Sequence, residues 1–65
     1  MKIKGKILGI KKGYNDQTLE VFIIDQLGHT YSNIVPKIEV FVHDTVICKL
    51  YENLYSVQVE SIKKL

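Results

Sequence analysis

The residues of this 65-residue chain that could do chemistry are lysines and aromatic residues. All nine cationic side chains are lysine, a point charge on a flexible stem that suits phosphate groups but reads base edges poorly. An aromatic ring offers a second kind of contact, because any nucleic-acid base can stack on it. The side chains that we expect to face a ligand are Lys2, Lys4, Lys6, Lys11, Lys12, Tyr14, Phe22, Tyr31, Lys49 and Tyr51.

Charge is divided unevenly along the chain, although the net charge is only +2. Residues 1–15 hold five lysines and no acid, whereas residues 16–62 hold all seven acids and only two lysines. The acids would repel phosphate, so a polyanion should bind where the N-terminal strand and the C-terminal Lys63 and Lys64 lie. Lysine is also an ordinary solubilising residue, and composition alone does not separate these two roles.

Residues that could catalyse a reaction or hold a metal are few. His29, His43, Asp25, Asp44 and Cys48 are the only reactive set, and their spacing fits neither an activated nucleophile nor a metal site. Cys48 also falls on the expected buried face of a strand, where a thiol is usually inert. We therefore expect no enzyme, no metal and no cofactor.

The elements that must position these side chains are β-strands, because the apolar residues are mainly Ile and Val and alternate with a period of two. The first strand is expected over residues 2–12. Ile10 falls out of phase with Ile7, and Gly5 and Gly9 permit the bulge or bend that explains the change.

The second strand, residues 18–25, should turn Leu19, Val21 and Ile23 inward and Phe22 outward. An outward Phe22 would serve base stacking, a second small core or a dimer contact equally well.

A turn at residues 25–28, closed by a left-handed glycine, leads to a third strand at residues 29–35, which Pro36 ends. The register of this hairpin stays open. A three-residue loop turns Tyr31 inward, and a two-residue turn puts it on the outward face beside Phe22.

Residues 36–42 are too β-branched for a helix and predict a loop or a short extra strand. Residues 45–51 and 55–62 then form a closing hairpin with residues 52–53 as a two-residue turn. That register predicts one buried face made of Val46, Cys48, Leu50, Tyr55, Val57 and Val59.

The segments EVFIID at 20–25 and EVFVHD at 39–44 are similar over too few positions to be an internal repeat. We interpret both as an aliphatic strand segment that ends in a turn-capping aspartate.

Five short antiparallel strands with a long bent first one favour a single small closed barrel over residues 1–65. The layout resembles the oligonucleotide/oligosaccharide-binding (OB) fold in the stretches KIKGKILGI, LEVFIIDQLGHTYSN and VHDTVICKLYENLYSVQVESIKKL. His43-Asp44 stands where Gly-Asp is usual in that fold. The compact gene V single-strand binding proteins of filamentous phages are similar in size, and a Src-homology-3-like barrel is the alternative.

The resemblance implies a protein that binds single-stranded DNA or RNA, with little sequence specificity, through its lysines and outward aromatic residues. The alternative is a protein-interaction module that uses Phe22, Ile24 and Ile47, and such an outward apolar patch also predicts a homo-oligomer such as a dimer. A lone cysteine and the absence of a signal-like or membrane-spanning apolar stretch predict a cytoplasmic protein without membrane contact.

Overall fold

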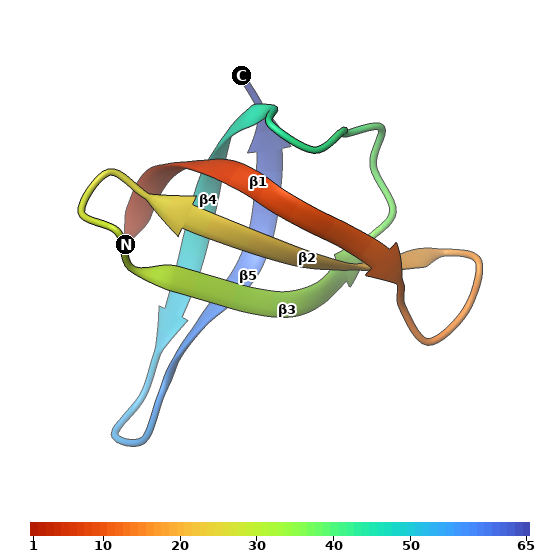
Figure 1. Ribbon diagram of the computed structural model, residues 1–65. Helices are drawn as coiled ribbons and strands as arrows, with labels where there is room; N and C mark the ends of the chain where they lie inside the picture. Colours follow the sequence, from red (N-terminus) through yellow and green to blue (C-terminus); the bar gives the residue numbers. More distant parts are fainter.

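Five antiparallel strands make up the computed structural model, which describes residues 1–65. They join in the order β3-β2-β1-β4-β5, and the two edge strands β3 and β5 lie against each other (Figure 1). The sheet therefore curls into a nearly closed barrel, which confirms the predicted all-β class and is consistent with a small OB-like barrel. The strands are β1 (Lys2–Lys12), β2 (Thr18–Asp25), β3 (Thr30–Pro36), β4 (Thr45–Glu52) and β5 (Val57–Lys64).

The long first strand shapes the barrel because its first part pairs with β4 and its second part pairs with β2. Residues Lys2 to Lys6 pair with β4, and the pairing with β2 runs from Gly5 to Lys12. The register with β2 shifts between Ile7 and Gly9, so the predicted bulge is confirmed. Gly5 belongs to both pairings, and a Cβ there would lie 2.9 Å from the carbonyl oxygen of Ile24.

The core is a set of aliphatic side chains from all five strands and from the loop before β4. Each fully buried side chain of this kind contributes roughly 1.5–3 kcal/mol. The predicted inward face of β2 is confirmed, because Val21 and Ile23 are fully buried and Leu19 packs against them. The nine buried hydrophobic residues are Ile7, Val21, Ile23, Val35, Val40, Val46, Cys48, Leu50 and Val59.

The β2–β3 turn has the predicted chemistry and fixes the register that the sequence left open. Gly28 takes a φ of +87°, and Oδ1 of Asp25 accepts the backbone N–H of Leu27 and of His29, both at 2.9 Å. Asp25 faces His29 across a three-residue loop, so Ile23 pairs with Tyr31. Tyr31 consequently points inward.

The seam between β3 and β5 is joined by a side chain and no backbone ladder. Nδ2 of Asn33 donates to the carbonyl oxygen of Val59 at 2.6 Å, and its Oδ1 accepts the N–H of Ile34 at 2.8 Å. β3 itself begins at Thr30 and ends at Pro36, one residue later at each end than predicted.

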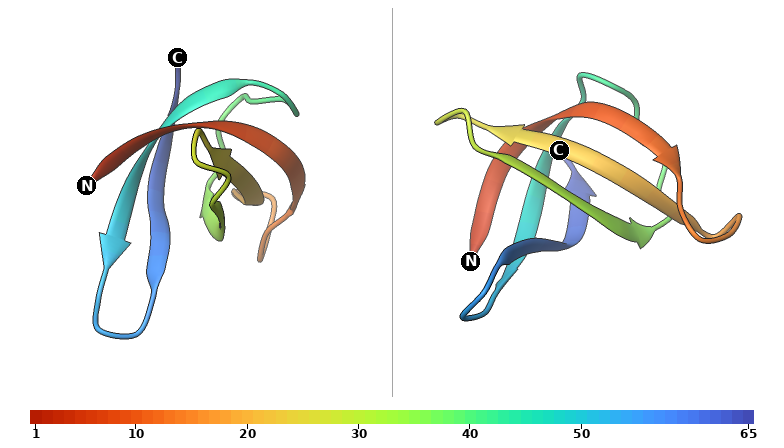
Figure 2. Two further views of the ribbon diagram at one scale, coloured as in Figure 1. Left: turned by 60° about the vertical axis from the view of Figure 1, so that its left-hand side comes forward. Right: turned by 60° about the horizontal axis from the view of Figure 1, so that its bottom comes forward.

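The predicted register of the β4–β5 hairpin is wrong. Glu52 pairs with Val57, and a four-residue loop replaces the expected two-residue turn. Asn53 stabilises this loop, because its Oδ1 accepts the N–H of Tyr55 at 2.8 Å and of Ser56 at 2.9 Å. Tyr55 is therefore 93% exposed and Val57 39% exposed, where we expected both to be buried. The hairpin extends beyond the rest of the barrel (Figure 2).

The segment between β3 and β4 is a loop, which was one of the two predicted alternatives, and not a short extra strand. Val40 of this loop is buried. The second EVF segment is thus not a strand, and that interpretation is wrong. Its aspartate still caps a turn, because Oδ2 of Asp44 accepts the N–H of Phe41 at 2.9 Å. His43 takes a φ of +78°, the left-handed conformation that glycine adopts most easily.

Candidate nucleic-acid interface

Five lysines share the outward side of the first half of β1, of β4, which pairs with it, and of β5, which pairs with β4. Alternate residues of a strand point to one side, so the lysines of β1 project together. Lys2 pairs with Lys49, and Lys4 pairs with Ile47, which in turn pairs with Lys63 on β5. All five are exposed. We call this surface the lysine face: Lys2, Lys4, Lys6, Lys49 and Lys63.

Most of the lysine face is free of ion pairs. Lys49 alone has a partner, Glu60, with 3.8 Å between Nζ and Oε2. Both side chains are about half exposed, and such surface pairs contribute little. A polyanion would therefore meet cations whose charges are largely uncompensated.

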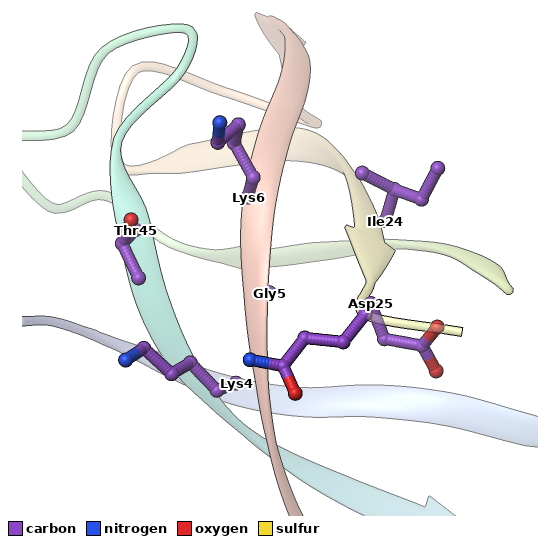
Figure 3. Close-up of a pocket in the computed structure, with 7 residues that line it drawn as sticks. Lys4, Gly5, Lys6, Ile24, Asp25 and Thr45 are labelled. Atoms are coloured by element: carbon purple, nitrogen blue, oxygen red, sulfur yellow. The ribbon is translucent and has the colours of Figure 1, made fainter. Parts of the chain in front are cut away.

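A hollow of about 320 Å³ adjoins the lysine face at the β2–β3 turn. Figure 3 shows Lys4 and Lys6 on β1, with Thr45 on one side and Ile24 and Asp25 on the other. Burial alone would raise the pKa of Asp25. The N–H groups of the turn and the Tyr31 hydroxyl outweigh it and hold that pKa below its ordinary value. The resulting anion makes this hollow mixed in charge.

Tyr31 does not lie on the outward face, which is a correction to its place among the expected ligand contacts. Its ring packs against the core, and its hydroxyl donates to Oδ2 of Asp25 at 3.0 Å. The three-residue loop causes this, because it sets Tyr31 opposite the buried Ile23. Tyr31 supports the turn, and it also lines the hollow that Phe22 and Leu8 border.

Phe22 points outward as predicted, so the phase of β2 is correct. It pairs with Gly9 and with Ser32, is half-buried, and lines a hollow of about 310 Å³ with Leu8. Nζ of Lys11 lies 5.6 Å from the centroid of the Phe22 ring, within reach of a cation–π contact. The surface thus combines an aromatic ring, a cation and an exposed leucine.

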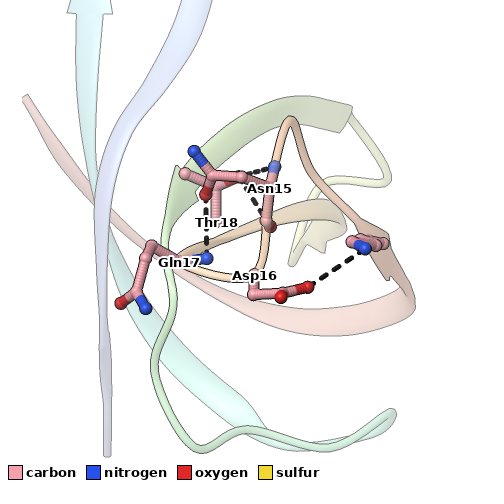
Figure 4. A network of polar contacts seen from close by, with 5 residues as sticks. Asn15, Asp16, Gln17 and Thr18 are labelled. Carbon is pink, nitrogen blue, oxygen red and sulfur yellow. Dashed lines mark hydrogen bonds and ion pairs between the residues drawn. The ribbon is translucent and has the colours of Figure 1, made fainter.

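Lys12 is the last residue of β1, and Tyr14 follows it in the β1–β2 loop. Tyr14 is almost fully exposed. Nζ of Lys12 lies 3.0 Å from Oδ1 of Asp16, so its charge is partly compensated (Figure 4). Oδ1 of Asn15 accepts the N–H of Gln17 at 2.8 Å in the same network. The loop is held by its own polar contacts, and Tyr14 is free to meet a ligand.

Tyr51 and the tip of the β4–β5 hairpin add further exposed apolar surface. Tyr51 follows Lys49 on the outward side of β4 and is exposed. Leu54 and Tyr55 at the tip are exposed above 90%. The sequence prediction missed both tip residues because it placed the turn two residues too early. The capping capacity of Asn53 was the signal for the longer loop.

The reactive residues do not converge. Nδ1 of His29 lies 3.5 Å from Oδ2 of Asp25 in one turn, whereas His43 and Asp44 lie in another. Cys48 is buried in the core, and burial raises the pKa of its thiol. No three metal-ligating side chains come together.

Comparison with known protein families, with curated proteins and with solved structures finds no match to this chain. None of its elements is a helix of the length and apolarity needed to cross a membrane. The molecule is thus defined by its fold as a small five-stranded β-barrel with a basic and partly aromatic outer surface.

Proposed function

We propose that the chain binds single-stranded nucleic acid with little sequence preference. The observation that carries the proposal is the Lys11 ammonium over the ring of Phe22, on the outer surface of the half of β1 that pairs with β2. Single-strand binding needs both kinds of group, a cation for the backbone and a ring for the bases.

The lysines would contact phosphates, and the absence of arginine favours binding without base readout. Lysine neutralises a phosphate but forms no planar pair of hydrogen bonds to a guanine edge. Binding through such contacts falls steeply with salt, because each neutralised phosphate releases counterions.

Phe22 would supply the stacking platform, with Tyr14 as a second ring at the adjacent loop. A stacked base contributes about 1–3 kcal/mol, whichever base it is. Leu8 and Phe22 bound the hollow in which a base would lie.

Fluorescence anisotropy with labelled oligo(dT) at two salt concentrations tests the proposal. Phe22→Leu keeps an apolar side chain on the outer face and should weaken binding roughly tenfold or more, with the salt slope unchanged. Phe41→Leu is the matched control, because Nζ of Lys64 lies at the same 5.6 Å from its ring centroid. The absence of binding at low salt would end the proposal, as would equal effects of the two variants.

The β4–β5 hairpin favours a second candidate function, self-association. Tyr51, Leu54, Tyr55 and Val57 are all exposed on one projecting element, and exposed apolar side chains gathered in this way can mark an interaction surface. Sedimentation equilibrium at high micromolar concentration should give a mass above that of one chain, and Leu54→Ser with Tyr55→Ser should lower it. A mass of one chain would exclude this function.

A further inference from the structure

We propose that the lysine face is a site for the backbone of duplex nucleic acid, distinct from the Phe22 surface that would stack single-stranded bases. The inference goes beyond the proposed function, since it assigns a second ligand class to a different part of the barrel. It stands on the position, the charge and the spacing of the five lysines.

The bend of β1 separates the two surfaces. Lys2 and Lys4 lie on the half of β1 that pairs with β4, whereas Lys11 lies beyond the bulge, on the half that pairs with β2. Figures 1 and 2 show the first half beside β4 and the second half beside β2. The lysines of the first half of β1 and the Lys11–Phe22 pair are therefore carried by different strand pairs.

The lysine face offers donors and almost nothing on which a base could stack. Its centre is Ile47, and a hollow of about 190 Å³ beside it is lined by Lys2, Lys49, Lys63 and the exposed Ser61. Tyr51 lies at the border of the face, on the far side of Lys49 along β4. Several ammonium groups and a hydroxyl around a shallow hollow suit the acceptor oxygens of a phosphate.

The spacing along β1 fits a phosphate backbone. Lys2, Lys4 and Lys6 occupy alternate positions of the strand, about 6.6 Å apart. The nucleic-acid backbone has six bonds per nucleotide, twice the three bonds per amino acid of a protein backbone. Neighbouring phosphates of one strand are therefore about as far apart as every second residue of a β-strand. Consecutive lysines can thus meet consecutive phosphates.

The spacing across the sheet fits two backbones. Lys4 and Lys63 flank Ile47 and lie two strand spacings apart, about 9.6 Å. The grooves of B-form DNA are about 6 and 12 Å wide, so flexible lysine stems on both sides of Ile47 can reach the two strands that border one groove. A single strand has no second backbone to fill these positions.

Anisotropy titration of a labelled duplex of mixed sequence tests the inference, with labelled oligo(dT) beside it. Lys2→Gln with Lys63→Gln should weaken duplex binding roughly tenfold at low salt and reduce the salt slope by about 1.8. Lys37→Gln with Lys64→Gln removes the same formal charge and should do neither. Both residues lie outside the lysine face, and Lys64, which was expected from the sequence to meet a polyanion, is paired with Asp44 at 3.3 Å. Exposed lysines contribute little to folding, and thermal melts will confirm that both pairs of substitutions leave the fold intact.

Phe22→Leu distinguishes the two proposals, because it should weaken oligo(dT) binding and leave duplex binding unchanged. If the duplex does not bind at low salt, or if the two lysine pairs weaken it equally, the lysine face is not a duplex site. If instead the duplex results hold and Phe22→Leu leaves oligo(dT) binding unchanged, the stacking role of Phe22 fails and the duplex site stands.

Discussion

Asn33 is the side chain through which the two edge strands of the barrel meet. Its Nδ2 donates to the carbonyl oxygen of Val59 at 2.6 Å, and Val59 is fully buried. In Asn33→Ala that carbonyl loses its partner in a place that water does not reach. A buried polar group left without a hydrogen bond costs about 1–3 kcal/mol.

This loss is large for so small a domain. Sixty-five residues predict a free energy of unfolding of about 3–10 kcal/mol, and a loss of 2 kcal/mol should lower the midpoint of thermal unfolding by roughly 8–16 °C. Urea titration followed by circular dichroism measures the change in free energy directly. Ser32→Ala is the control, because Ser32 is an exposed residue of the same strand.

A charged replacement of Asn33 provides a second test of the hydrogen bond to Val59. Asn33→Asp keeps the size of the side chain but sets a carboxylate against the Val59 carbonyl, so it should destabilise more than Asn33→Ala at neutral pH. The difference should shrink as the carboxyl is protonated, toward about pH 4 or below. If Asn33→Ala stays within about 0.5 kcal/mol of the unaltered protein, packing alone closes the seam and the reasoning is refuted.

Substitutions at three other positions test local features of the fold. Gly5→Ala would bring a Cβ to 2.9 Å from the carbonyl oxygen of Ile24, and we expect it to lower the urea unfolding free energy by about 1–3 kcal/mol; an unchanged midpoint would show that the strands shift freely there. His43→Gly should be more stable than His43→Ala by about 1 kcal/mol in the same assay, because glycine takes the φ of +78° without strain; equal stability would contradict this. The folded-state pKa of Asp25 lies below its ordinary value of 3.8, since burial, which raises it, is outweighed by hydrogen bonds from the turn and from a tyrosine hydroxyl. Its contribution to stability is therefore present above pH 3.8 and lost as the pH falls below that value. Asp25→Asn should flatten the acid side of the stability profile, and an unaltered profile would exclude this role.

The sequence by itself determined the features that depend on neighbouring residues. Period-two alternation placed β1 and β2 at their observed bounds, because side chains of a strand point to opposite sides in turn. The out-of-phase Ile10 and the nearby Gly9 located the bulge. Asp25 and Gly28 specified their turn, since a short acceptor and a residue tolerant of positive φ act within a few positions.

Only the tertiary structure decided how these elements face one another. The register of β4 with β5 depends on a loop that Asn53 caps, and two registers of that hairpin bury alternating faces that look alike in sequence. The seam at Asn33 joins residues 26 positions apart, which no local pattern encodes. The separation of the lysine face from Phe22 likewise follows from the bend of β1. The two halves of this curved strand pair with different strands, so the lysines of its first half and Lys11 in its second half lie on different parts of the surface.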